Sequence, residues 1–114
     1  MNKFIVLYRA PLSVLEEWSK TDPEVRKETE KKMQTDWQTW MGAHAQSVEE
    51  TVGAGKTKRV TKNGVEDSKN DVMLYSIVEA DSHEEAAKMF EGHPHLGIPE
   101  ASIEVMAANP LKGM

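Results

Sequence analysis

Two histidines at alternate positions of a proline-containing loop, His93-Pro94-His95, offer the side chains of this chain best suited to proton chemistry. An imidazole has an unperturbed pKa of about 6.5 and can therefore exchange a proton at neutral pH. Alternate residues of an extended loop point the same way, so both rings could converge on one ligand. The pattern predicts His93 and His95 as catalytic or ligand-binding residues. A second interpretation stays open, because a histidine that follows Gly92 at a helix C-terminus also complements the helix dipole.

Metal binding by the same loop would need at least a third ligand, because two imidazoles do not complete a protein metal site. The side chains that could supply it are those of Glu91, Glu100 and His44. Residues 55–57 (Gly-Lys-Thr) imitate the end of a phosphate-binding loop, but Glu50 stands where that motif needs a glycine. We therefore expect no metal and no nucleotide or other cofactor.

A stripe of aromatic residues gives a further group of candidates. Trp37 and Trp40 fall on one face of an amphipathic helix expected over residues 23–45, and His44 continues that face. Tyr75 lies in the middle of a strand expected across from this helix. The stripe is either part of the core or the aromatic wall of a cleft between helix and sheet. On the second interpretation, His44, Trp37, Trp40 and Tyr75 are ligand-binding residues.

The composition excludes several other classes of protein. The 114 residues include 14 Lys and Arg against 19 Asp and Glu, and the formal net charge of −5 argues against nucleic-acid binding. The chain has no cysteine, which excludes disulfides and cysteine nucleophiles and suits a reducing cytoplasm. The apolar run at residues 4–8 is too short for a signal peptide or a membrane span. We therefore expect a cytoplasmic protein that binds neither nucleic acid nor membrane.

Hydrophobic periodicity and helix-start signals predict an alternating order of strands and helices. Ser13 and Ser82 each stand three residues before a glutamate, which is the spacing of a capping box. Either Thr21 or Asp22 can cap a long helix whose first turn holds Pro23. The expected elements are a strand over residues 2–9, helices over 14–20 and 23–45, a weak strand over 48–52, a hairpin or irregular loop over 57–67, a strand over 71–80, a helix between 82 and 92, and a strand over 102–106.

This order predicts an α+β fold of the ferredoxin-like βαββαβ type. Two βαβ units with right-handed crossovers give a four-stranded antiparallel sheet with two helices on one face. The length fits one domain, so we expect residues 1–114 to form a single domain. The other face of the sheet would be bare, and we expect Phe4, Val6, Tyr75 or Ile77 on it. A homodimer formed through this sheet face would cover them.

Residues spread through most of this order resemble those of the YCII-related (YciI-like) proteins. The similarity is most specific in Tyr75-Ser-Ile-Val-Glu-Ala-Asp-Ser82, in His93-Pro-His-Leu96 and in Ala101-Ser-Ile-Glu-Val105. Residues 4–10 and the tail over 110–114 are also similar, whereas residues 48–70 match poorly. The resemblance implies a homodimer of the dimeric α+β barrel type, with a cleft in each subunit.

The resemblance does not carry a reaction over to this chain. Some proteins of this kind have a His–Asp pair proposed as catalytic, and one branch eliminates chloride from chlorinated hydroxyquinols. Here residues 23–33 contain no histidine, and His93 stands where those proteins often place an acidic residue. The His–Asp mechanism is therefore not transferred, although the position of the loop beside the cleft is.

Three functions of different kinds stay open, and metal binding by the loop over residues 93–95 ranks behind the other two. One is the binding of a small molecule in a helix–sheet cleft near the loop over residues 93–95, with lyase-like or proton-transfer chemistry. The alternative is a non-catalytic dimeric module that binds a metabolite or regulates. The sequence does not decide whether the protein is an enzyme.

Overall fold

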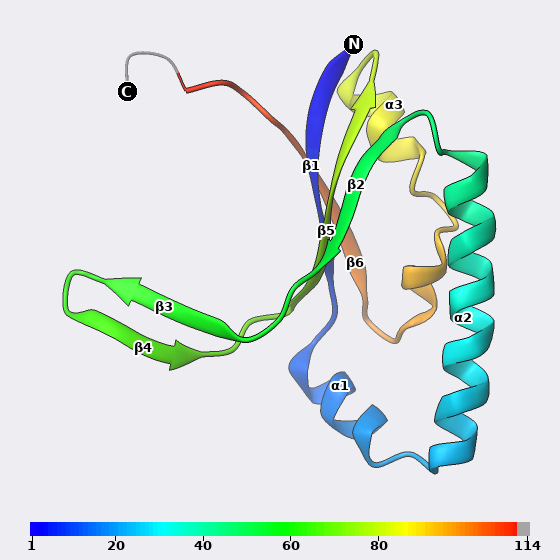
Figure 1. Cartoon of the computed structure of the whole chain (residues 1–114), viewed down its shortest axis with the longest axis vertical. Helices are drawn as coiled ribbons and strands as arrows, with labels where there is room; N and C mark the ends of the chain where they lie inside the picture. The colour runs from blue at the N-terminus through cyan, green and yellow to red at the C-terminus, as the bar shows by residue number, and fades with distance from the viewer. Residues whose placement is uncertain (112–114) are drawn as a thin grey trace.

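A four-stranded antiparallel sheet with helices packed on one side forms the body of the protein (Figure 1). The structure is a computed structural model and describes residues 1–111. The sheet order is β2-β5-β1-β6, with every neighbouring pair antiparallel, and this α+β arrangement is consistent with a ferredoxin-like fold. The elements are β1 (Asn2–Arg9), α1 (Leu12–Ser19), α2 (Pro23–Ala43), β2 (Val48–Gly53), β3 (Thr57–Thr61), β4 (Gly64–Ser68), β5 (Val72–Ala80), α3 (His83–Lys88), the 3-10 helix η1 (Pro94–Gly97) and β6 (Ser102–Ala107).

The last three residues of the tail that resembles the YCII-related proteins, Lys112 to Met114, lie outside the described residues.

The long helix α2 begins where the sequence predicts. The Asp22 side chain accepts a hydrogen bond from the backbone N–H of Glu24 at 2.8 Å, and Pro23 occupies the first turn. This cap satisfies one of the backbone donors that a helix start leaves free. The helix ends at Ala43, two residues before the predicted end, and His44 follows as its C-terminal cap.

Side chains of the sheet alternate between a covered face and an open face. Phe4 and Val6 of β1 are at most 2% exposed and point to the helices, so their predicted place on the uncovered side is wrong. The predicted place of Tyr75 and Ile77 is confirmed by the register, because each neighbours a buried residue of β5 that points to the helices. The open face carries these apolar side chains: Ile5, Leu7, Val52, Tyr75, Ile77 and Met106.

The hydrophobic core lies between the covered face and the helices α2 and α3, which Figure 1 shows on the same side of the sheet. Trp40 of α2 stacks on Phe90, just after α3, with ring centroids 5.0 Å apart. Burial of each large apolar side chain contributes about 1.5–3 kcal/mol to the free energy of unfolding. The buried cluster consists of Phe4, Val6, Tyr8, Trp40, Val78, Ala80, Ala86 and Phe90.

The segment between β2 and β5 forms a separate two-stranded hairpin, β3–β4. Its turn holds Asn63 and Gly64, as predicted, and Gly64 has a φ of +122°, which other residues rarely adopt. Figure 1 shows the hairpin projecting from the sheet on the side opposite α2.

Among residues 1–111, no helix combines the length and the apolar character needed to cross a membrane.

The two Ser-x-x-Glu sequences fold differently, although their spacing is the same. Ser82 caps α3, because its Oγ accepts a hydrogen bond from the backbone N–H of Glu85 at 3.1 Å. The capping box predicted at Ser13 is wrong: α1 already begins at Leu12, after Pro11, and no side chain caps it. A serine placed inside the first turn cannot act as the cap of that turn.

These two serines make a matched pair for a stability measurement. We expect Ser82→Ala to lower the free energy of unfolding by about 1 kcal/mol, because the substitution removes a cap. Ser13→Ala removes no cap and should change it by less than about 0.5 kcal/mol. Urea unfolding followed by circular dichroism measures both, and equal losses for the two variants would contradict the assignment of the caps.

Candidate functional site

The histidine loop folds as a turn of 3-10 helix, η1, and the extended loop expected from the sequence is wrong. The His93 Nδ1 atom accepts a hydrogen bond from the backbone N–H of His95 at 3.0 Å, and Pro94 opens the turn. Gly92, with a φ of +71°, lets the chain reverse direction after α3. Both imidazoles are only 1% exposed. The turn therefore directs the two rings into the protein rather than toward solvent.

The His93 ring is enclosed by aromatic side chains from several elements. Trp37 and Trp40 of α2 approach it edge-on, with centroid distances of 4.3 and 4.6 Å. Tyr8 of β1 lies at 5.5 Å and Phe90 at 5.8 Å. Sequence reasoning selected the histidine and both tryptophans, and the structure brings these three together. They form part of the core rather than the wall of an open cleft.

This environment keeps the His93 imidazole neutral. Burial, together with smaller contributions from charge repulsion by His95 and His44, lowers its pKa to about 4. Since Nδ1 accepts a hydrogen bond, the single ring proton of the neutral form lies on Nε2. The Nε2 atom is buried and has no hydrogen-bond partner among the described residues.

His95 joins the turn to the end of β1. Its Nε2–H donates a hydrogen bond to the carbonyl oxygen of Arg9 at 2.9 Å, and its ring meets Tyr8 edge-on at 5.6 Å. Burial lowers the pKa of His95, while its hydrogen bonds to the backbone of Arg9 and Ser102 act in the opposite direction. The His95 side chain therefore links η1 to the end of β1 in the sheet.

His44 caps the C-terminal end of α2. Its Nδ1–H donates to the Trp40 carbonyl oxygen at 2.8 Å, which also accepts the backbone N–H of His44 at 3.1 Å, and its ring stacks on Trp40 at 4.2 Å. The Trp40 indole N–H in turn donates to the carbonyl oxygen of Met89 at 3.3 Å. Both side chains therefore have complete structural roles at this end of the helix.

Tyr75, the fourth aromatic candidate, does not join this group, because it points to the open face of the sheet. Tyr8 holds the corresponding place on the covered face and was missed. Its hydroxyl bonds to Ser76 Oγ at 2.7 Å, which bonds to Thr51 Oγ1 at 2.7 Å. Burial raises the pKa of Tyr8, so the phenol stays protonated. No signal in the sequence could have found it, because residues 4–8 are apolar at every position and their alternation does not show which face is covered.

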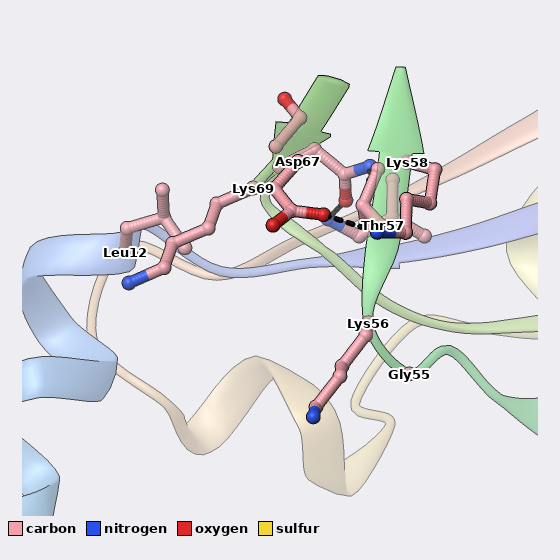
Figure 2. A pocket seen from close by; sticks show the side chains of 10 residues that line it. Leu12, Gly55, Lys56, Thr57, Lys58, Asp67 and Lys69 are labelled. Atoms are coloured by element: carbon pink, nitrogen blue, oxygen red, sulfur yellow. Dashed lines mark hydrogen bonds and ion pairs between the residues drawn. The ribbon is translucent and has the colours of Figure 1, made fainter. Parts of the chain in front are cut away.

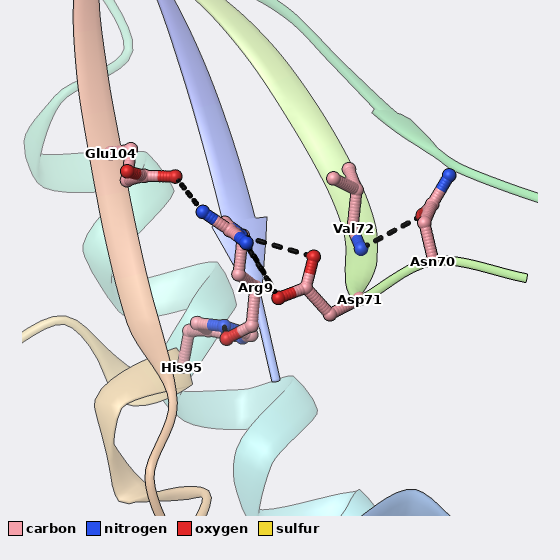
Figure 3. A network of polar contacts seen from close by, with 6 residues as sticks. All are labelled: Arg9, Asn70, Asp71, Val72, His95 and Glu104. Carbon is pink, nitrogen blue, oxygen red and sulfur yellow. Dashed lines mark hydrogen bonds and ion pairs between the residues drawn. The ribbon is translucent and has the colours of Figure 1, made fainter. Parts of the chain in front are cut away.

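An ion network on the open face was also missed (Figure 3). The Arg9 guanidinium lies between Asp71, to which its Nη2 donates at 2.7 Å, and Glu104. Hydrogen bonds from Arg9 lower the pKa of Asp71, and the two carboxylates raise the pKa of Arg9. The same residue accepts the His95 hydrogen bond through its backbone, so it links the open face to the turn. Nothing local in the sequence marks these distant partners.

A cavity of about 490 Å³ lies directly beyond the histidine turn. Gly97, Ile98 and Pro99 form one wall, and α1 and the first half of α2 form the others. Neither His93 nor His95 lines it. The other lining residues are mainly apolar: Val14, Leu15, Glu17, Trp18, Thr21, Thr29, Glu30, Met33 and Met73.

A second hollow, of about 540 Å³, lies at the base of the β3–β4 hairpin (Figure 2). Three lysines line it, Lys56, Lys58 and Lys69. Lys58 is paired with Asp67 across the hairpin, and Figure 2 shows Lys56 directed away from that pair. The hollow is therefore polar and wide, unlike the apolar cavity beside α1.

Within residues 1–111, no three His, Cys, Asp or Glu side chains come close enough together to hold a metal ion. The third ligand that the loop would need, from Glu91, Glu100 or His44, does not meet His93 and His95.

Comparison of the sequence with protein families finds no match, and comparison with curated proteins finds none either. Among solved structures, the chain is similar to 5-chloro-2-hydroxyhydroquinone dehydrochlorinase from Burkholderia phenoliruptrix AC1100, in complex with 2,5-dihydroxybenzoquinone. The TM-score is 0.45 at 17% identity, and the match covers 91% of each chain. At this level of similarity it assigns neither a family nor an activity to this chain.

The buried imidazole makes stability depend on pH in a defined direction. Between about pH 6.5 and pH 4 the unfolded chain binds a proton at His93 that the folded chain does not. The contribution of His93 is therefore fully present above about pH 6.5 and falls as the pH is lowered, by on the order of 3 kcal/mol at about 1.4 kcal/mol per pKa unit. Urea unfolding at pH 7, 6 and 5 should show a steeper loss for the wild type than for His93→Asn, which keeps a cap acceptor.

His83→Asn, the same substitution at an exposed position that leaves His93 and its surrounding rings in place, is the matched control. An NMR titration in which the His93 ring becomes protonated at its ordinary pKa would contradict this account.

Proposed function

We propose that this protein binds a small apolar or aromatic amine in the cavity beyond the histidine turn and works as a homodimer. The observation that carries the proposal is the lining of the cavity, where apolar side chains surround one indole and two carboxylates. Its volume of about 490 Å³ lies in the range of small-molecule pockets.

The charge of the ligand is inferred from Trp18 and its neighbours. The Trp18 indole N–H donates to Glu30 Oε1 at 3.4 Å, which holds this carboxylate beside the ring. Glu17 is the other charged residue among those that line the cavity. An anionic ligand would add a third negative charge, whereas an ammonium group would pair with a carboxylate and could lie over the indole face.

The position of the cavity favours the binding module over the enzyme. His93 and His95 lie behind the wall formed by Gly97 to Pro99 and would hold that wall in place without touching the ligand. Our proposal therefore puts the expected ligand cleft on the α1 side of the turn. His44, Trp37 and Trp40 would act in the same indirect way, through the core.

A proton-transfer or lyase-like activity of His93 or His95 is the second candidate. The observation that favours it is the unpartnered Nε2 atom of His93. A substrate would have to reach a ring that is 1% exposed, and a pKa of about 4 makes this ring a weak base at neutral pH. We therefore place this activity second.

The homodimer is proposed from the open face of the sheet. A sheet that is apolar on both faces needs a layer on each, and α2 and α3 cover only one. A second copy placed against Ile5, Leu7, Tyr75 and Ile77 would supply the other layer. Membership of the YCII-related family, its dimeric α+β barrel form, the single domain over residues 1–114 and the cytoplasmic location belong to the same proposal.

Two probes that share a benzyl group and carry opposite charges test the ligand. We expect 2-phenylethylamine to shift the NMR signals of Trp18, Met33 and Ile98, and phenylacetate to shift them far less. Glu30→Gln should weaken binding of the amine by about fivefold, the effect of losing one exposed ion pair of about 1 kcal/mol. Glu28→Gln, on the same helix but outside the cavity lining, is the matched control. Equal shifts with the acid, or none with the amine at millimolar concentration, would refute the proposed ligand class.

A further inference from the structure

We propose that the β3–β4 hairpin is an arm that grips a second copy of this chain. The inference rests on the proposed homodimer, and it assigns a role to residues 56–69, which the ligand cavity does not use. It is carried by the isolation of the hairpin, its direction and its charge.

The hairpin is not part of the main sheet. Among the described residues, β3 and β4 pair only with each other. Val60 and Val65 face each other across this ladder and are 74% and 67% exposed. An isolated two-stranded hairpin is at best marginally stable in water, and exposed strand edges invite pairing with other chains. A contact surface for the valine pair would stabilise the arm.

The direction of the hairpin points to a second copy as its partner. Figure 1 shows it leaving the body on the side opposite α2, which is the side of the open sheet face. Five-residue strands reach about 16 Å at roughly 3.3 Å per residue, whereas packed sheets lie about 10 Å apart. If two copies pack through their open faces, each arm extends past the interface and lies along the other copy.

The arm and the rest of the chain carry opposite net charges. Residues 56–69 hold five Lys and Arg against two Asp and Glu, a net charge of +3, while the other residues hold nine against seventeen, a net charge of −8. Two of the arm's cations already pair within the hairpin, Lys58 with Asp67 and Arg59 with Glu66. Lys62 has no ion pair within residues 1–111, and neither do Lys56 and Lys69.

On the open face, Lys3 and Arg9 are already neutralised by carboxylates. Glu50 and Glu79 lie on the same face and make no ion pair in the described part of the chain. These carboxylates are the natural partners of the free lysines of an arm from the other copy. In a two-fold dimer the contact forms twice, because each copy gives one arm and receives one.

Sedimentation velocity over a range of concentrations tests the arm. We expect Lys62→Glu with Lys69→Glu to raise the dimer dissociation constant roughly tenfold or more, since two charges are reversed in each of two arms. Val60→Ser with Val65→Ser should also weaken the dimer. The matched controls are Lys27→Glu with Lys31→Glu, the same change of charge on exposed α2, and Val25→Ser. Both controls should dimerise like the wild type.

An exchange of charges between two variant chains is the decisive test. A chain with Glu50→Lys and Glu79→Lys, mixed with the Lys62→Glu, Lys69→Glu chain, should form a heterodimer more readily than either forms a homodimer. Arm variants that dimerise as tightly as the wild type would overturn the arm and leave the dimer intact. A wild type that stays monomeric at micromolar concentration, or an Ile77→Asp variant that still dimerises, would overturn the sheet-face dimer instead. The arm proposal would also be overturned if the hairpin bound oligonucleotides and the arm substitutions left the dimer dissociation constant unchanged.

Discussion

The burial of one neutral imidazole, that of His93, is the interaction on which the helical side of this molecule depends. Its ring contacts α2 through two tryptophans and β1 through Tyr8, while its Nδ1 fixes the turn that follows. A charged imidazole in this apolar surrounding would be strongly disfavoured, which is why its pKa falls to about 4. The histidine turn leads directly into residues 97–99, which form one wall of the apolar cavity. A residue that looks catalytic in the sequence thereby supports, without lining it, the cavity for which we propose a ligand.

The sheet imposes the second constraint, because its two faces are both apolar and the chain covers one of them. The helices bury Phe4 and Val6, whereas Ile5 and Leu7 stay on the open side. The ion network around Arg9 spans the open face at the end nearest the histidine turn.

The order of the strands and helices could be predicted because local signals set it: alternation in the strands, Asp22 before α2, and the Asn-Gly turn of the hairpin. The covered face of β1 could not, since residues 4–8 are apolar at every position and their periodicity does not choose a side. His93 could be singled out, but its role could not, because the rings that enclose it come from distant parts of the chain. The cavity depends on how α1, α2 and residues 97–99 are arranged around it, which no local pattern encodes.

The central claim is that the histidine turn builds a ligand cavity without touching the ligand. Intermolecular NOEs between bound 2-phenylethylamine and the protein test it most directly, because they report which side chains lie within a few ångströms of the probe. The account predicts NOEs from the probe to the Trp18 indole and to the Ile98 methyl groups, and none to the His93 ring. NOEs from the probe to the His93 ring would contradict it and would make this imidazole a group that meets the ligand.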